Sequence, residues 1–312
     1  MFGDPDALRK SQWHVSSFLP PYTLARLNHP NRFRWVFCQL EALRHCFPPS
    51  IRHILEELPE TLDTTYERIS REINKANREH AHRLLQCLTV AVRPLRVAEL
   101  AEVLAIDFGT VAGGGASNLN TDWRWEDQEQ AVLSTCSSLI AVVDEDGDQV
   151  IHFSHFSVEE FLTSPRLADS TTDVSCFHIL LEPAHTILGK ACLGVLLQLD
   201  DRVDKSDIED SFPLARYAAE HWANHAQYEN VSSLLREGMK TLFDPDRPYF
   251  SAWIQFHDID IDDTLWEFTE FSSHRLSAGP LCYASLCGFY DIGSSVGEGT
   301  LQGGTVTPSA RC

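Results

Sequence analysis

The sequence predicts a mainly α-helical protein that carries one small β-hairpin. Two observations predict this fold class. Apolar residues recur every three or four positions over several stretches, and two β-type runs flank an Asp-Gly pair. The chain has 312 residues, of which 43 % are hydrophobic and 22 % charged, a composition that can bury more than one small core.

The segment from residue 32 to 77 is expected to be a helical connector. The run "RFRWVFCQLEALRHCF" is amphipathic and stops at Pro48-Pro49. A second helix is predicted in "LPETLDTTYERISREI", whose apolar residues lie on one face: Leu62, Tyr66, Ile69 and Ile73.

Over residues 78–165 the sequence predicts a mixture of helices and strands instead of helices alone. The helical run "NREHAHRLLQCLTVAV" is followed by a short helix in "RPLRVAELAEVLAI" and a helix around residues 126–138. Two β-type runs, "LIAVVDE" and "QVIHFSH", then meet at Asp146-Gly147, a strong hairpin signal, and a short helix follows. Helix, short helix, helix, hairpin and short helix is the order of a winged-helix domain.

The remainder is expected to be helical again. The run "FHILLEPAHTILGKACLGVLLQL" is apolar nearly all round over its second half, which predicts a buried helix. "GPLCYASLCGFYDI" has the spacing of an ankyrin first helix. The predicted organisation is a disordered leader (1–31), a helical connector (32–77), a winged-helix domain (78–165), a C-terminal helical region (174–275), one partial ankyrin repeat (279–292) and a disordered tail (293–312).

The charge balance restricts the partners. There are 45 acidic and 25 basic residues, a formal net charge of −20. Such a chain repels nucleic acid and anionic lipid. Its nine cysteines form no C-x-x-C pair and lie mostly in apolar runs, which is typical of a reducing compartment. No signal peptide or membrane-spanning run is present, so a cytoplasmic protein is expected.

The stretch "QVIHFSHFSVEEFLTSP" raises the possibility of a hydrolase or metal site. Strand alternation would point His152 and His155 to opposite faces, which suits neither joint metal ligation nor a Ser154–His155 relay. Ser157 and Glu160 fit a capping box at a helix start, with Phe153, Phe156 and Phe161 in the core.

A second candidate is "EHWANH", which places His221 and His225 one helical turn apart. This is zinc-ligand geometry, but no Glu follows the first His and the sequence suggests no third ligand. The simpler interpretation is a helix face that carries Tyr217, His221 and Trp222 into an interface.

The winged-helix pattern also suggests DNA binding as a possible function. The expected recognition helix begins "DWRWEDQEQ", with one Arg124 among acidic residues, and the wing tip is "DEDGD". Both elements would repel a polyanion, so protein contacts are favoured. Trp123 and Trp125 are candidates for packing on a neighbouring domain.

Several of these runs, among them "LTVAVRPLRVAELAEVLA", "WEDQEQAVLSTCSSLI", "FSHFSVEEFLTSPRL" and "FPLARYAAEHW", resemble the region between the NACHT domain and the ankyrin repeats of filamentous-fungal STAND-type proteins. The winged-helix stretch is also similar to the one of GPI inositol-deacylase-like proteins. The resemblance covers residues 32–292. It implies an NTPase domain before this region and a sensor array of ankyrin repeats after it.

The chain departs from that plan at both ends. It has no G-x-x-x-x-G-K-[ST] sequence and one ankyrin-type helix, so a truncated family member is expected. The favoured hypothesis is a non-enzymatic regulatory module, without cofactor or metal, that contacts a NACHT domain or ankyrin-bearing relatives. The predicted interface residues are Trp123, Trp125, His152, His155 and Trp222. The alternatives are a winged-helix nucleic-acid-binding regulator, and a hydrolase or zinc protein that uses the histidine motifs.

Overall fold

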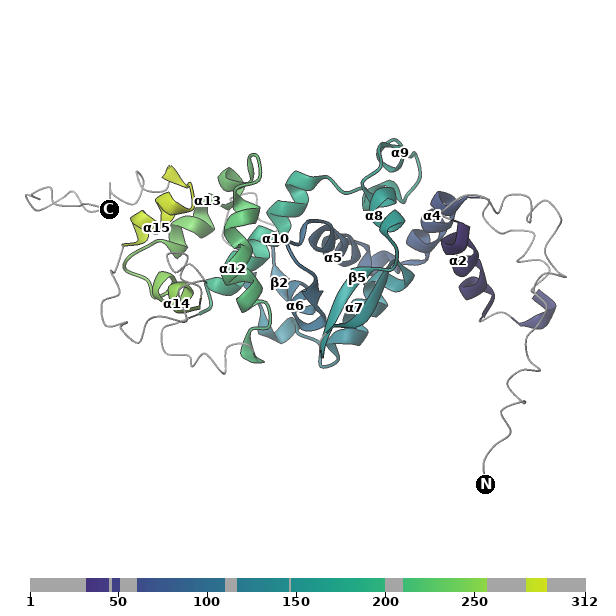
Figure 1. Ribbon diagram of the computed structural model, residues 1–312, viewed down its shortest axis with the longest axis horizontal. Helices are drawn as coiled ribbons and strands as arrows, with labels where there is room; N and C mark the ends of the chain where they lie inside the picture. The colour runs from purple at the N-terminus through teal and green to yellow at the C-terminus, as the bar shows by residue number, and fades with distance from the viewer. Residues whose placement is uncertain are drawn as a thin grey trace, which may run out of the picture. The chain divides into compact units, whose positions relative to one another are not determined.

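The computed structural model describes residues 32–44, 47–50, 61–109, 117–145, 147–199, 210–256 and 279–290. The chain divides into two compact units, Met1–Arg68 and Ile69–Cys312. The described part is mostly helical with a small antiparallel sheet, which confirms the predicted fold class (Figure 1). The predicted leader (1–31) and tail (293–312) lie outside the described residues.

Twelve α-helices and five strands occur among the described residues. The helices are α2 (Arg32–Arg44), α4 (Leu62–Glu72), α5 (Arg78–Val90), α6 (Val97–Val103), α7 (Gln128–Cys136), α8 (Phe156–Leu162), α9 (Pro165–Ala168), α10 (Leu181–Leu196), α12 (Ala215–Ala226), α13 (Val231–Leu242), α14 (Tyr249–Phe256) and α15 (Pro280–Leu286). The strands are β1 (Leu95–Arg96), β2 (Ile106–Asp107), β3 (Asn118–Leu119), β4 (Ile140–Glu145) and β5 (Asp148–Phe153).

The connector helices α2 and α4 form largely as predicted. The hydroxyl of Thr61 accepts a hydrogen bond from the backbone N–H of Thr64 at 3.2 Å and so satisfies a free donor at the start of α4. Tyr66, Ile69 and Ile73 are buried, which confirms three positions of the predicted stripe, whereas Leu62 is partly exposed. In α2 the amphipathic pattern is a poor guide to burial, because Phe37 and Leu40 are 51 % and 44 % exposed.

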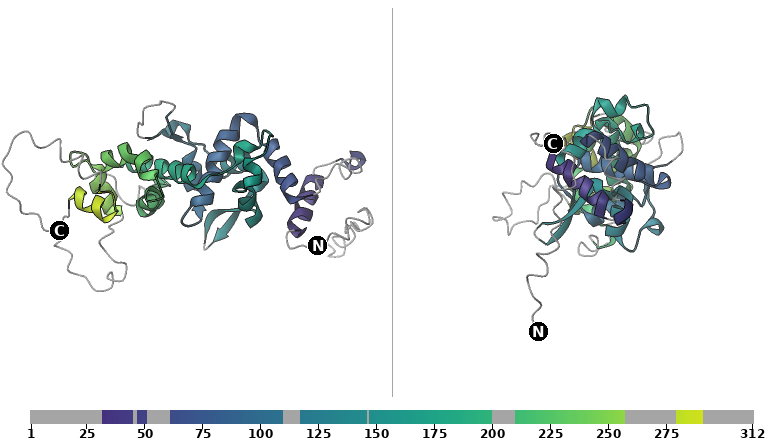
Figure 2. Two further views of the ribbon diagram at one scale, coloured as in Figure 1. Left: turned by 90° about the horizontal axis from the view of Figure 1, so that it is seen from above. Right: turned by 90° about the vertical axis from the view of Figure 1, so that its right-hand side faces the viewer.

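The sheet of the winged-helix region has three strands in the order β1-β5-β4, all antiparallel. Strands β4 and β5 form the predicted hairpin, in which Val142 pairs with Ile151. Gly147 lies at the turn with φ +93°, a backbone conformation that disfavours every residue with a Cβ. The tip of the hairpin projects beyond the helices (Figure 2).

Two features of this region are absent from the sequence-based prediction. The two-residue strand β1 adds a third strand to the hairpin. A second two-stranded sheet joins β2 to β3, with Ile106 opposite Leu119, where no strand was predicted. Strands this short carry too few alternating residues to give a periodic signal.

Helix α10 forms the centre of the C-terminal part. It packs against α5, α12 and α13, and all its residues from Ala191 to Leu196 are buried, which confirms the predicted buried helix (Figure 1). Beyond it an aromatic cluster joins α12, the end of α13, α14, α15 and the residues just after α15. Its members are Trp222, Phe243, Phe250, Trp253, Tyr283 and Phe289.

The segment predicted to be an ankyrin first helix does form a helix. Pro280 occupies the first turn of α15, and Gly288 follows the helix with φ +80°. Tyr283 and Ala284 are buried against the aromatic cluster. The assignment of this helix to an ankyrin repeat stays a prediction.

No helix among the described residues is both long enough and apolar enough to cross a membrane.

A buried carboxylate fixes the start of the winged-helix sheet. Glu99 on α6 is 0 % exposed and accepts two hydrogen bonds from the Arg93 guanidinium, at 2.8 and 2.7 Å. The backbone N–H of Arg96 donates to the same carboxylate at 2.8 Å. A buried charge is tolerated only when it is paired and hydrogen-bonded, so this network orients β1 against α6.

Replacing Arg93 by alanine is expected to lower the free energy of unfolding by about 2 kcal/mol, because Glu99 then remains buried with a weaker set of partners. Urea denaturation measures this change. Lys240→Ala is the control, since Lys240 pairs with the exposed Glu237 at 3.0 Å. The control should cost at most about 0.5 kcal/mol. Equal losses in the two variants would contradict the assigned role of Arg93.

Candidate interaction surface

Trp123 and Trp125 lie between β3 and α7, at the end of a short 3-10 helix over Thr121–Trp123. Their side chains are 49 % and 59 % exposed. The residue between them, Arg124, is turned inward instead. The two indoles therefore lie on the surface, and Arg124 between them attaches this segment to the rest of the protein.

Arg124 is anchored by three contacts. Its guanidinium forms an ion pair with Glu102 of α6, whose side chain is 1 % exposed. It also donates to the backbone oxygen of Ser211 at 2.7 Å and lies 5.7 Å from the ring centroid of Phe212, just before α12. The anchor thus ties the tryptophan segment both to α6 and to the start of α12.

Burial raises the pKa of Glu102 and the hydrogen bond from Arg124 lowers it, with burial the larger effect. The carboxylate is stable in its charged form only while Arg124 stays in place. Because Arg124 is held in place, the backbone of its two neighbours, Trp123 and Trp125, is restricted as well.

The surroundings of the two indoles are acidic. Asp122 and Glu126 are exposed, and neither has an ion-pair partner among the described residues. Arg124 is the single Lys or Arg between residues 117 and 139, and it points inward. We call Asp122, Trp123, Trp125 and Glu126 the tryptophan surface.

The predicted interface residue His152 lies elsewhere, on β5. Its Nε2 is 2.8 Å from Oε1 of Glu145, on the neighbouring strand. His152 also lines a small groove of about 250 Å³ together with Arg93, Phe153 and Glu159. Its role in an interface stays a prediction.

His155 lies just after β5, where it caps α8. Its Nδ1 accepts a hydrogen bond from the backbone N–H of Ser157 at 3.3 Å. The predicted Ser157–Glu160 capping box is therefore wrong, because His155 is the capping residue and Ser157 lies inside the helix. Phe156 was expected in the core but is 59 % exposed, while Phe161 is buried as predicted.

The serines near His155 are poorly placed for nucleophilic catalysis. Ser157 Oγ lies 2.7 Å from Nδ1 of His155, but Ser157 is only 5 % exposed. Ser154 donates its hydroxyl proton to the backbone oxygen of Ser138 at 2.8 Å. A nucleophile must reach the substrate, so the buried Ser157 is better explained as part of the helix cap.

Trp222 was predicted to line an interface, and the structure corrects this. Its side chain is 0 % exposed and packs against Trp253 and Phe289 at centroid distances of 5.5 Å each. Tyr217, expected on the same face, is also fully buried. The amphipathic pattern of α12 identified the apolar face correctly, but that face is covered by the chain itself.

In the structure, His225 of the zinc hypothesis is already engaged by other side chains. His225 is 0 % exposed, and both of its ring nitrogens are engaged: Nδ1 lies 2.9 Å from Nδ1 of His185, and Nε2 lies 2.9 Å from the Tyr217 hydroxyl. Within the described ranges, no three His, Cys, Asp or Glu side chains are grouped as a metal site.

Sequence reasoning missed the hydrogen-bonded chain that includes His225. The backbone N–H of Val92 donates to the Tyr217 hydroxyl at 3.1 Å. If Tyr217 donates its own proton to His225 Nε2, then His225 Nδ1 carries the ring proton and donates to His185. This arrangement satisfies every group in the chain and keeps His225 neutral. The partners are 8 to 125 residues apart, so no local pattern reveals them.

Comparison with known proteins identifies one domain. Residues 66–173 match the family model described as "GPI inositol-deacylase, winged helix domain". This confirms the predicted winged-helix domain and its type. The tryptophan surface and both predicted histidines, His152 and His155, lie within the matched residues.

A search of curated proteins gives a relative from Monascus ruber named "Azaphilone pigments biosynthesis cluster protein L". The two chains are 31 % identical over 242 residues, which cover 75 % of this chain and 50 % of the relative. The chain thus spans about half the length of the curated relative that it matches. No solved structure matches significantly.

The pKa of His225 is lowered to about 3, first by burial and then by the nearby His185 and His221. In the unfolded chain its pKa is about 6.5. As the pH falls below about 6.5, His225 is protonated in the unfolded chain but not in the folded protein. The free energy of unfolding therefore decreases as the pH is lowered. Between pH 7 and pH 5 His225 alone should remove about 2 kcal/mol from the free energy of unfolding.

The measurement compares urea denaturation of the unaltered protein and of His225→Gln at both pH values. His82, whose pKa is also lowered mainly by burial and which does not contact His225, contributes equally to both proteins. The variant should therefore lose about 2 kcal/mol less than the unaltered chain on acidification. Parallel losses would show that His225 does not stay neutral in the folded protein.

Proposed function

We propose that this chain is a non-enzymatic regulatory module whose winged-helix domain, of the GPI inositol-deacylase type, binds another protein domain. The observation that carries the proposal is the presentation of Trp123 and Trp125 on the surface by the ion pair between Arg124, which is 28 % exposed, and the buried Glu102. Large exposed aromatic side chains are unusual on a surface that contacts only water, and Trp is the residue type most enriched in interface hot spots.

The charge of the same surface supports a protein partner over nucleic acid. A winged-helix domain that binds DNA offers basic residues to phosphates and base edges. The tryptophan surface instead carries Asp122 and Glu126, and the hairpin ends in Asp144, Glu145 and Asp148, all exposed. A partner surface that bears Lys or Arg would gain both ion pairs and cation–π contacts here.

The resemblance to fungal STAND-type proteins suggests which domain the partner is. In that arrangement the module would lie between a NACHT domain and ankyrin repeats, and its winged helix would hold the NACHT domain in an inactive state. Release by a distant event would require an interface with two alternative packings. The match covers 50 % of the length of the relative from Monascus ruber, which supports a role as one part of a larger protein assembly.

The test is a pull-down of the purified chain with the NACHT domain of a full-length fungal relative, with ADP, with ATP and without nucleotide. We expect binding in the ADP state. The double variant Trp123→Ala/Trp125→Ala should weaken binding at least about 10-fold, because interface tryptophans are common hot spots. Tyr290→Ala is the matched control, since Tyr290 is 75 % exposed but lies outside the winged-helix domain.

Circular dichroism of each variant verifies folding, since exposed side chains can be truncated with little effect on stability. Arg124→Ala should weaken binding although Arg124 itself faces inward, because it removes the anchor of the two indoles. Absence of binding in every nucleotide state would overturn the proposal. Binding that the tryptophan variants leave unchanged would overturn the assignment of this surface.

A further inference from the structure

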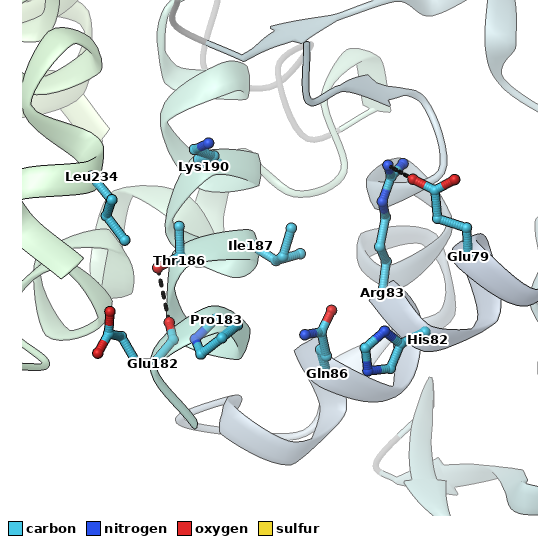
Figure 3. A pocket seen from close by; sticks show the side chains of 10 residues that line it. All are labelled: Glu79, His82, Arg83, Gln86, Glu182, Pro183, Thr186, Ile187, Lys190 and Leu234. Carbon is cyan, nitrogen blue, oxygen red and sulfur yellow. Dashed lines mark hydrogen bonds and ion pairs between the residues drawn. The ribbon is translucent and has the colours of Figure 1, made fainter. Parts of the chain in front are cut away.

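A groove of about 480 Å³ opens on the protein surface between α5 and α10 (Figure 3). One wall is α5, the floor is the first half of α10, and Leu234 of α13 stands on the opposite side. Ile187 points from α10 toward α5. The groove belongs to neither the tryptophan surface nor the groove beside His152.

The groove lies along the part of α10 that its neighbours leave partly open. Among the described elements, α5, α12, α13 and β3 pack against α10, and every residue from Ala191 to Leu196 is buried. Before that segment, Pro183 and Ile187 of α10 line the groove, and so does Leu234 of α13, which is 52 % exposed. These three side chains form an apolar strip along the groove.

Gln86 makes the groove more than an apolar strip. It lies on α5, lines the groove and is only 6 % exposed. Its amide forms no hydrogen bond with the described residues, and its nitrogen and oxygen are not fully shielded from solvent, so the amide is open to the groove. A side-chain amide has donors and an acceptor that a bound ligand can engage in place of water. A ligand in the groove that offers one donor and one acceptor would satisfy it.

Two charged side chains of α10 also face the groove without ion-pair partners in the described part of the chain: Glu182 near one end and Lys190 near the other. The other two charged residues that line the groove, Arg83 and Glu79 on α5, form an ion pair with each other. Along α10 a ligand therefore meets first the acidic Glu182 and then the basic Lys190.

We propose that this groove binds a short extended peptide segment of another protein, with a basic residue at the Glu182 end, an apolar residue in the middle and an acidic residue at the Lys190 end. The extended form follows from Gln86. A side-chain amide pairs with a free backbone peptide group, whereas the peptide groups of a helix are already used within the helix.

The spacing of the three residues follows from helix and strand geometry. Glu182 and Lys190 are eight positions apart on α10, which corresponds to about 12 Å along the helix axis. An extended chain advances about 3.3 Å per residue, so four steps cover about 13 Å. Residues i, i+2 and i+4 of such a chain point to one face. The recognised pattern is basic-x-apolar-x-acidic, with the apolar side chain against Ile187 and Leu234.

The experiment uses two fluorescein-labelled peptides with capped ends and Gly-Ser flanks, one with the core Lys-Ala-Leu-Ala-Glu and the other with the uncharged core Gln-Ala-Leu-Ala-Gln. Fluorescence anisotropy measures the binding of each to the full chain at low ionic strength. The first peptide should bind about 10-fold more tightly, because in one of the two chain directions it pairs with both Glu182 and Lys190, whereas the second pairs with neither. No binding of the first peptide, or equal binding of both, overturns the proposal.

Variants test the assignment of the individual residues. The double variant Glu182→Gln/Lys190→Gln should abolish the preference between the peptides. The matched control Glu237→Gln/Lys240→Gln removes an exposed charge pair on α13 and should leave the preference unchanged. Gln86→Leu removes the amide at nearly constant volume and should weaken both peptides about 10-fold. A retained preference in Glu182→Gln/Lys190→Gln, or full affinity in Gln86→Leu, contradicts the proposed binding mode.

Discussion

Two buried carboxylates on the seven-residue helix α6 constrain the whole winged-helix region. Glu99 and Glu102 lie one helical turn apart and are 0 % and 2 % exposed. Because an unpaired charge cannot remain in the protein interior, each must hold an arginine from another part of the chain. Glu99 holds Arg93 and thereby the start of β1, and Glu102 holds Arg124 and thereby the tryptophan segment. The specificity of the fold in this region rests on these two pairs.

The same constraint links the surface to the C-terminal helices. Arg124 donates to the backbone oxygen of Ser211, next to the start of α12, so the presentation of Trp123 and Trp125 depends on where α12 begins. The segment before the tryptophans is also fixed to α10, since Gln198 donates to the side chain of Asn118 at 2.7 Å. A partner that moved the tryptophan surface would therefore act on elements well outside the winged-helix domain. This is a physical basis for a regulatory module, in which a contact at one place biases packing at another.

The histidine chain adds a third connection between these parts. His185 on α10, His225 and Tyr217 on α12, and the backbone of Val92 after α5 form one hydrogen-bonded series. The aromatic cluster around Trp222 holds the far side of α12. Helix α12 is thus polar and hydrogen-bonded on one side and apolar on the other, with both sides buried. An amphipathic pattern alone would have placed the polar side in water and left the apolar side free for a partner, whereas the chain itself covers both Trp222 and His225.

The sequence by itself determined the features that depend on local spacing. The apolar stripe of Tyr66, Ile69 and Ile73, the buried run of α10 and the hairpin at Gly147 all follow from residues a few positions apart, because helix and strand periods and turn conformations are local properties. The winged-helix order could be read from them. Only the tertiary structure decided which aromatic and charged residues are available to partners. Trp123 is exposed next to Arg124, which pairs with Glu102, whereas Trp222 is buried against Trp253 and Phe289. Gln86 lines a groove that the described helices leave open. These outcomes depend on residues far apart in the chain, whose distances are fixed only when the elements pack.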